Sequence, residues 1–249
     1  MNNFRIDVIS LFPEAFSGFF NHGLIKKAFA EKIAFLDIHN PRDYSIDNYK
    51  KVDDEPYGGG AGMVLKPEPY FSAFEKIPTH KNRKVLLMTP QGKKISQSDF
   101  YRWSKEDQLV LICGSYEGFD ERIRSLADEE VSVGDFVLTG GEIPAITVIN
   151  GVMRLLPGTL GSSESLKDES HNEFLLEHSQ YTRPFEFRGL KVPELLRSGN
   201  HEAISKWRRK QSILRTKERR PDLYEKWLYQ NSSSMQTIKD QADELYPDW

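Results

Sequence analysis

Cysteine is nearly missing from this sequence, and long apolar runs are missing altogether. The 249 residues contain one cysteine, Cys113, which excludes an internal disulfide and a zinc site built from several cysteines. There is no run of about 18 apolar residues, so we expect no transmembrane helix and no membrane partner. The N-terminal segment Met1–Ile6 carries Arg5 where a signal peptide needs its apolar stretch. We therefore expect a cytoplasmic protein.

Common nucleotide and metal motifs are lacking as well. No stretch matches the GxxxxGK(S/T) phosphate loop or the GxGxxG turn after a strand, which disfavours a dinucleotide-binding fold. The six histidines are scattered, and His171 and His178 have no cysteines beside them to complete a metal site. We expect Cys113, at the end of an apolar run, to be a packed core thiol rather than a nucleophile.

Positive charge is concentrated in one segment. The whole chain has a net charge of −3, but residues 183–220 hold twelve Lys/Arg and four Glu, a net of +8 that leaves −11 for the remainder. A basic segment on an otherwise acidic protein indicates a polyanionic partner for that segment. A solvated helical face explains the charge alone equally well.

The first 157 residues have the pattern of an α/β domain, because short apolar runs alternate with amphipathic stretches. Two of these runs are nearly all apolar, as expected for parallel strands that are buried on both faces. Pro13 suits the first turn of a helix. The predicted strands are Phe4–Ser10, Ala34–His39, Val85–Met88 and Leu109–Cys113, and the predicted helices include Gly23–Lys32 and Glu142–Leu155.

The composition changes after residue 157. Gly, Ser, Glu, Lys and Asp dominate residues 158–172, which is typical of a flexible linker. Beyond it the chain becomes basic and helical, and Asn200 can cap a helix. We expect the apolar face of this helix to contain Ile204, Trp207 and Leu214. The predicted organisation is an α/β domain at 1–157, a linker at 158–172 and a small helical domain at 173–249.

Three glycine-bearing turns stand out in the first domain: Tyr57–Gly62, Gly114–Gly118 and Gly134–Glu142. Glycine lets the backbone approach a ligand closely, so a side chain at Gly140 or Gly141 would occupy space that a ligand needs. Ligands of parallel α/β sheets bind at the carboxyl ends of the strands, where two of these turns and Pro90–Gly92 are expected. Any one of the turns could simply be tight, but three together favour a cofactor pocket.

Four motifs in order give the chain a specific resemblance. They are Asp54–Met63, Cys113–Arg122, Ser132–Glu142 and Tyr181–Pro184, and together they resemble the bacterial tRNA (guanine-N1)-methyltransferase family over about residues 4–228. The resemblance implies a SPOUT-type α/β domain with a deep trefoil knot, and a C-terminal domain that binds tRNA. It also implies a homodimer with shared active sites, and S-adenosylmethionine-dependent methylation of guanine N1 at position 37, beside the anticodon.

The resemblance also assigns residues. In the family the knot loops hold the cofactor largely through backbone groups. The substrate-binding set that we expect is Glu117, which would hold the guanine or a magnesium ion, together with Arg208, Arg209, Lys210 and Arg215 on the basic helix. The matching cofactor positions are Met88, Thr89, Pro90, Gly114, Val133, Gly134, Asp135, Phe136, Val137, Leu138, Gly140 and Gly141.

Two groups are needed for the chemistry at guanine N1. Neutral guanine carries a proton on N1, which a carboxylate can accept as general base. An arginine near O6 would stabilise the developing charge, and the family's arginine matches Arg154. The family's base is an aspartate fifteen residues after that arginine and twelve before the Tyr-Thr-Arg-Pro motif, and this register leads to Glu169. Asp168 is the neighbouring carboxylate, so the catalytic candidates are Arg154, Glu169 and Asp168.

Two other functions compete with this interpretation. The same fold superfamily includes enzymes that methylate the 2′-oxygen of ribose, a reaction that needs no base for guanine N1. An RNA-binding protein without catalytic activity could also keep the scaffold. The presence of Arg154, the carboxylate pair and the glycine loops argues against the second alternative.

Overall fold

The computed structural model describes residues 3–160, 170–171 and 173–231. The chain forms two compact units, Met1–Gly161 and Ser162–Trp249, and each is treated by itself below. Within the described part of the chain, no helix combines the length and apolar character needed to cross a membrane.

A five-stranded parallel sheet forms the centre of the first unit. Its strands are arranged in the order β2-β1-β6-β5-β7, and every neighbouring pair is parallel. The α/β prediction with a parallel sheet is therefore confirmed. The bounds are β1 (Phe4–Ile9), β2 (Ala34–His39), β5 (Arg83–Lys94), β6 (Gln108–Cys113) and β7 (Glu129–Ser132).

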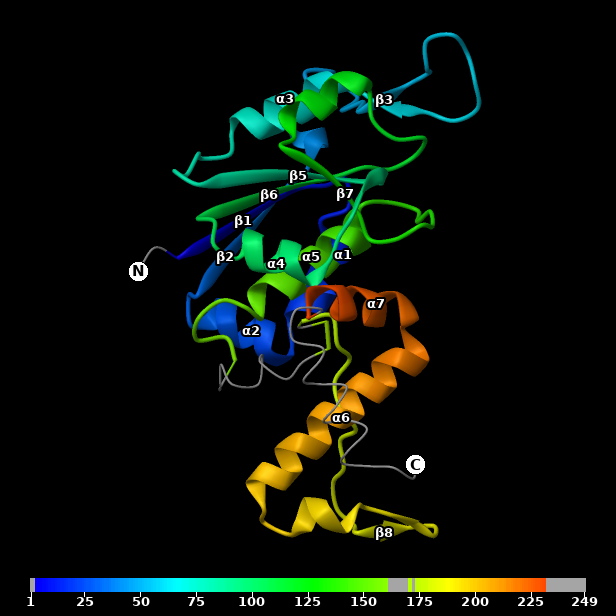
Figure 1. The fold of residues 1–249 in the computed structure, drawn as a ribbon. Helices are drawn as coiled ribbons and strands as arrows, with labels where there is room; N and C mark the ends of the chain where they lie inside the picture. The colour runs from blue at the N-terminus through cyan, green and yellow to red at the C-terminus, as the bar shows by residue number, and fades with distance from the viewer. Residues whose placement is uncertain (1–2, 161–169, 172, 232–249) are drawn as a thin grey trace. The chain divides into compact units, whose positions relative to one another are not determined.

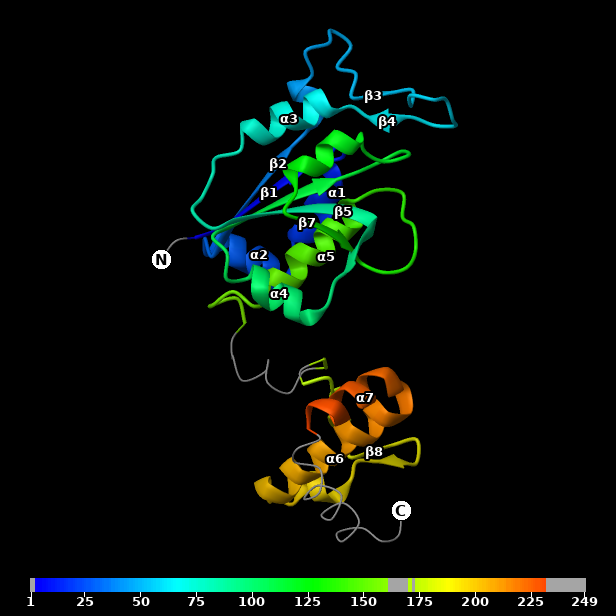
Figure 2. The same ribbon diagram turned by 45° about the horizontal axis from the view of Figure 1, so that its top comes forward.

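Helices cover both faces of this sheet (Figures 1 and 2). All six residues of β6 are buried, and successive side chains enter different cores. Leu109 and Leu111 pack with one set of helices, whereas Val110 and Ile112 pack with the other, as the period of two along a strand requires. One core includes residues of α1 (Glu14–Phe20), α2 (Gly23–Ala30), α4 (Gln97–Trp103) and α5 (Glu142–Met153), and the other includes residues of α3 (Pro67–Glu75).

Strand β5 is longer than predicted. The predicted strand Val85–Met88 does not end at Met88 but runs to Lys94, with a shift of register against β7 between Met88 and Lys93. The backbones come so close there that a Cβ atom on Gly92 would overlap Val131 N of β7. Proline and glycine in this segment therefore accompany an irregularity of the strand rather than its end.

A buried carboxylate, Asp7 of β1, ties three elements of the unit together. Its side chain is fully buried and accepts hydrogen bonds from Arg5 Nε (3.0 Å) and Gln108 Nε2 (2.8 Å). His39 Nε2 lies 3.0 Å from Asp7 Oδ1. Burial alone would raise the pKa of Asp7, but the bonds to His39, Arg5 and Gln108 outweigh it and lower this pKa from 3.8 to about 2.

The first prediction concerns this carboxylate. A lowered pKa stabilises the folded protein above about pH 4, and the stabilisation is lost as the pH falls toward 2. The shift corresponds to about 2 kcal/mol. Asp7→Asn should therefore lower the free energy of unfolding by about that amount at pH 7, and the difference from wild type should shrink between pH 4 and 2. Denaturant unfolding across this range is the measurement.

Asp37→Asn is the matched control, because Asp37 also pairs with Arg5 (2.5 Å) but is 58% exposed. We expect little effect from it. A difference between wild type and Asp7→Asn that stays constant from pH 7 to pH 2 would contradict the prediction.

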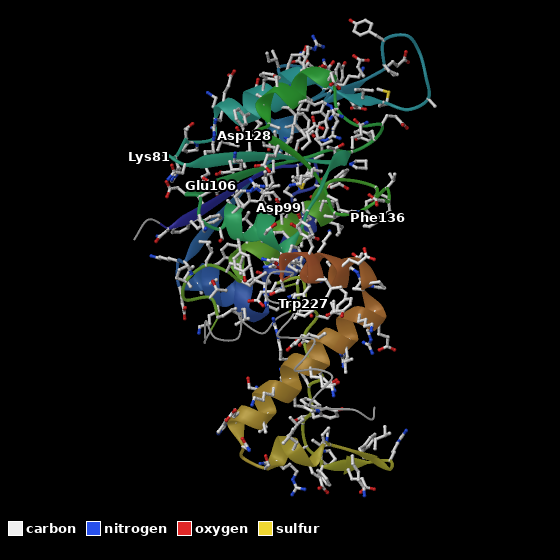
Figure 3. The ribbon with its side chains drawn as sticks, in the orientation of Figure 1. Lys81, Asp99, Glu106, Asp128, Phe136 and Trp227 are labelled. Carbon is white, nitrogen blue, oxygen red and sulfur yellow. The ribbon has the colours of Figure 1, made fainter. Side chains whose placement is uncertain are left out.

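The second unit consists of a small hairpin and two packed helices. The hairpin pairs β8 (Glu186–Phe187) with β9 (Leu190–Lys191), and the helices are α6 (His201–Arg219) and α7 (Pro221–Gln230). The predicted cap is confirmed, since the Asn200 side chain accepts a hydrogen bond from Ala203 N at 3.1 Å. Trp227 of α7 is buried (Figure 3).

The predicted apolar face of α6 is wrong at Leu214, which is 48% exposed. The buried position is Thr216, whose hydroxyl accepts from Leu176 N (2.8 Å) and donates to Ser212 O (2.6 Å). Positions two residues apart on a helix differ by about 200°, so Leu214 points away from the core that Thr216 enters. The hydroxyl satisfies its bonds inside the helix packing, which the apolar periodicity alone does not indicate.

Candidate functional site

A cavity of about 380 Å³ lies at the carboxyl ends of β6 and β7, beside the irregular part of β5. Three segments form its wall: Met88–Gln91 within β5, Gly114–Phe119 after β6, and much of Val131–Gly141 between β7 and α5. This is the edge of a parallel sheet at which ligands bind, and the volume is in the usual range for small-molecule pockets. Its side chains include both apolar and polar groups.

Most of the residues assigned to cofactor binding meet in this cavity. Gly134 and Asp135 are the two that do not line it. Gly134 instead exchanges hydrogen bonds with Ser132 Oγ, and Asp135 pairs with Lys94 at 2.6 Å. The ten that line it are Met88, Thr89, Pro90, Gly114, Val133, Phe136, Val137, Leu138, Gly140 and Gly141.

Backbone contacts hold the two glycine loops against each other. Gly141 N donates to Gly114 O at 2.8 Å, and Ser115 and Gly140 form an antiparallel bridge. The start of α5 is fixed below them by Glu142, a buried residue that accepts a hydrogen bond from Ser10 Oγ at 2.7 Å. These contacts within the protein hold the pocket wall in place.

The glycines are needed for a different reason from the one expected. A Cβ atom on Gly141 would lie 2.8 Å from Cys113 Cα, and one on Gly114 would lie 2.7 Å from the Phe119 ring. A Cβ on Gly140 would overlap the Glu142 carboxylate. The space that a side chain would take is therefore occupied by the protein itself, so these glycines allow the loops to pack rather than leave room for a ligand.

The second prediction follows from this packing. Gly141→Ala should destabilise the first unit by about 1–3 kcal/mol, because backbone atoms of β6 have no room to move away, and it should weaken ligand binding only through the displaced wall. Thermal unfolding with calorimetric ligand titration measures both. Gly18→Ala is the control, since a Cβ on Gly18 would meet no atom within 4 Å beyond its chain neighbours and its own helix backbone. Wild-type stability of Gly141→Ala would contradict the prediction.

The loop before α5 presents large apolar side chains to solvent. Phe136 is 55% exposed, Val137 82% and Leu138 41%, and Figure 3 shows Phe136 on the loop between β7 and α5. Each of the three also lines the cavity. The wall on this side is therefore suited to an apolar or aromatic part of a ligand.

The turn Tyr57–Gly62 does not line the cavity, so two of the three glycine turns form it. This turn lies behind Glu117 instead. Gly62 has φ +83°, and a Cβ on it would come within 2.7 Å of Glu117 Cδ. Glu117 N also donates to Met63 O at 3.1 Å. The turn therefore contributes indirectly, by holding Glu117, which does line the cavity.

Arg124 is a wall residue that the sequence motifs do not include. Its Nη2 donates to Gln91 Oε1 at 2.7 Å, and its Nε lies 2.9 Å from Glu121 Oε2. A hydrogen bond to Glu130 raises the pKa of Arg124. Arg124 thus joins β5, the 3-10 helix η2 (Glu121–Leu126) and β7 at the rim. Only proximity in the fold reveals it, because it lies two residues beyond the recognised motif.

Cys113 is a core thiol, as predicted. It is 1% exposed, and burial raises its pKa well above the usual value. Its carbonyl accepts a hydrogen bond from Tyr70 Oη at 3.1 Å. Among the described residues, no three His, Cys, Asp or Glu side chains are grouped so that they could hold a metal ion.

Arg154 does not belong to the cavity of its own chain. Pro144, in the first turn of α5, lines the cavity, whereas Arg154 follows the last residue of this helix. A helix of 12 residues spans about 18 Å. The predicted base Glu169 and its neighbour Asp168 lie outside the described residues.

The basic side chains of α6 have different environments. Arg208 lines a second cavity, within the C-terminal unit, whereas Arg209 pairs with Glu173 at 3.1 Å. Arg215 donates to Ser179 Oγ. Lys210 is partly buried. The four residues are therefore not one uniform charged face.

The fold and this pocket define a class: an α/β protein with a cavity at the carboxyl edge of a parallel sheet, joined to a separate unit that contains the basic segment 183–220. Comparison with known proteins narrows the class. The family model described as tRNA (Guanine-1)-methyltransferase TrmD matches residues 4–226. The chain therefore belongs to this family.

Curated relatives agree with this assignment. A tRNA (guanine-N(1)-)-methyltransferase from Synechococcus sp. (strain CC9311) is 64% identical over 228 residues, which cover 91% of this chain and 95% of the relative. One from Prochlorococcus marinus (strain MIT 9312) is 57% identical, with 90% and 91% covered. One from Trichodesmium erythraeum (strain IMS101) is 58% identical, with 88% and 97% covered.

Proposed function

We propose that the protein methylates N1 of a guanine in tRNA, beside the anticodon at position 37, with S-adenosylmethionine as methyl donor. Family membership and the names of the relatives support the reaction. The observation that carries the assignment of the site is the cavity, which ten of the twelve expected cofactor residues line.

The cavity has features that suit S-adenosylmethionine. It combines backbone groups of two packed loops with the exposed apolar side chains of Phe136, Val137 and Leu138, which can cover an adenine ring. When bound, the cofactor supplies an electrophilic methyl group. The role of the loops is to hold it in one orientation and to exclude water from the methyl group.

The remaining residues act on the guanine. Glu169, or Asp168 beside it, accepts the N1 proton, so that the nitrogen lone pair becomes available. Arg154 stabilises the charge that develops on O6. Glu117 and Glu121 are the carboxylates that line the cavity in the described structure, and one or two carboxylates suffice for a magnesium ion that keeps several waters.

The proposal extends to the assembly. We infer a cytoplasmic homodimer whose active sites are each shared between two chains, because Arg154 follows Pro144, the lining residue on α5, by ten helical residues, or about 15 Å. We also infer that the first domain carries the family's trefoil knot. Membership of the family supports this inference. The linker at 158–172 and the tRNA-binding domain at 173–249 complete the proposed organisation.

One assay tests the function. The protein is incubated with unmodified tRNA and S-adenosylmethionine labelled in the methyl group, and the tRNA is then digested to nucleosides. We expect the label in 1-methylguanosine. Label on a ribose 2′-oxygen would show that the protein is a ribose methyltransferase instead. If the protein binds tRNA but transfers no label, it is an RNA-binding protein without this activity.

A further inference from the structure

The C-terminal unit contains a cavity of its own, with a volume of about 620 Å³. The Tyr181–Arg183 part of the fourth sequence motif forms one side of it. Further lining comes from Phe185 beside the hairpin, Arg197 of the 3-10 helix Glu194–Arg197, and Arg208 of α6. Every lining residue that the structure describes lies between His178 and Arg208.

Among the described residues, acidic groups do not balance the positive charge in this cavity. Arg183, Arg197 and Arg208 line it, and the described residues contribute no carboxylate to the lining. Within that same part of the chain, none of these three arginines forms an ion pair, whereas the neighbouring Arg209 pairs with Glu173 at 3.1 Å. An unbalanced set of guanidinium groups favours a ligand that carries phosphate.

Aromatic side chains lie beside the arginines of this cavity. Tyr181 is 49% exposed, and its ring lies 6.4 Å from that of Trp207. The Arg197 guanidinium stacks on Phe185, with Cζ 4.3 Å from the ring centroid. Aromatic rings and guanidinium planes are the surfaces on which unpaired nucleobases stack. The volume is in the range of pockets that enclose small molecules.

We propose that this cavity binds one unpaired nucleotide of the RNA substrate, with its base against Tyr181 and its phosphate on Arg183 and Arg208. The inference rests on the proposed function, which supplies the RNA. A base inside a duplex presents only its edge, so the nucleotide that enters must come from a loop or a bulge, or must be turned out of its helix. The site adds a contact to tRNA that is separate from the methylated guanine.

The test measures the affinity of the full-length protein for an unmodified tRNA transcript at several salt concentrations. Tyr181→Leu should weaken binding about tenfold, and Tyr181→Phe should bind like wild type, because stacking needs the ring. Arg208→Gln should weaken binding and lower the slope of log affinity against log salt by about 0.7 for one lost contact to single-stranded RNA. Lys226→Gln, an exposed charge change on α7, is the control that should leave binding unchanged.

The outcomes separate this proposal from the proposed function. If wild type transfers no methyl group to guanine N1, the proposed function fails. If wild type does transfer the methyl group but Tyr181→Leu binds tRNA normally, only the nucleotide site is wrong. This holds even if Arg208→Gln weakens binding, because a surface that binds phosphate does not need an aromatic ring. If Tyr181→Leu and Arg208→Gln both bind tRNA normally, the cavity does not bind RNA and must be assigned to another ligand. Calorimetry with S-adenosylmethionine and thermal unfolding should match wild type for all four variants, which excludes misfolding as the cause.

Discussion

Glu169→Gln should lower the single-turnover rate of guanine N1 methylation by about 10²–10⁴, the usual loss when a general base is removed. The position follows from the sequence: Glu169 is fifteen residues after Arg154 and twelve before Tyr181, as in the family's pattern, without insertion or deletion. Glutamine keeps the size of the side chain but cannot accept the N1 proton. Affinity for S-adenosylmethionine should change little, because the base acts on the guanine.

Asp168→Asn is the matched control, and we expect a nearly normal rate. Asp168 has the side-chain length of the family's aspartate but lies one residue out of register, and if the segment is extended when the guanine is bound, only one of two neighbouring carboxylates faces the base. The reverse pattern would move the role to Asp168. If both variants kept full activity, a carboxylate base in this segment would have to be abandoned.

Mixing two inactive variants should restore activity. Arg154→Ala removes the arginine and leaves the cavity intact, whereas Leu138→Glu places a charge in the apolar wall and leaves the arginine intact. Because α5 holds Arg154 about 15 Å beyond Pro144, which lines the cavity of the same chain, we expect each arginine to serve the cavity of the partner chain. A mixed dimer then has one complete site.

In a random mixture about half of the dimers are mixed, so about a quarter of the wild-type activity should return. The measurement is methyl transfer to tRNA after subunit exchange, with exchange verified by differently tagged chains. Calorimetry should show that Leu138→Glu has lost cofactor binding and that Arg154→Ala has kept it. If exchange is complete and no activity returns, each arginine acts in its own chain and the shared site is wrong.

The sequence predicted those elements whose apolar pattern is strong. Strand β2 was predicted at its observed bounds, Ala34–His39, and helix α5 within two residues of its end. Helix α3 was not predicted because Pro67 and Pro69 suggest a loop, although proline is tolerated in the first turn of a helix. Strand β7 was not predicted because it begins with two acidic residues, Glu129 and Glu130. These residues are acceptable because β7 is an edge strand and their carboxylates form ion pairs with arginines from α4 and η2.

The sequence motifs indicated which residues come together in the fold, but not the contacts that hold them there. The family motifs led to ten residues that the fold brings into one cavity. The reason for the glycines, and the place of Arg124 at the rim, depend on contacts between segments far apart in the sequence, which no local pattern contains. The turn Tyr57–Gly62 shows the same limit, since its composition suggested a ligand contact and its structure places it behind Glu117.

Helix α5 fixes the distance between the glycine loop before it and Arg154 after it. Nine of its twelve residues are buried, from Glu142 beside the cavity to Met153, so the helix can neither bend aside nor unwind without loss of the core. One inserted residue would turn Arg154 by about 100° and move it by about 1.5 Å. Substitutions of equal volume along this helix should thus be tolerated in natural or engineered variants, whereas a change in the number of residues between Gly141 and Arg154 should not.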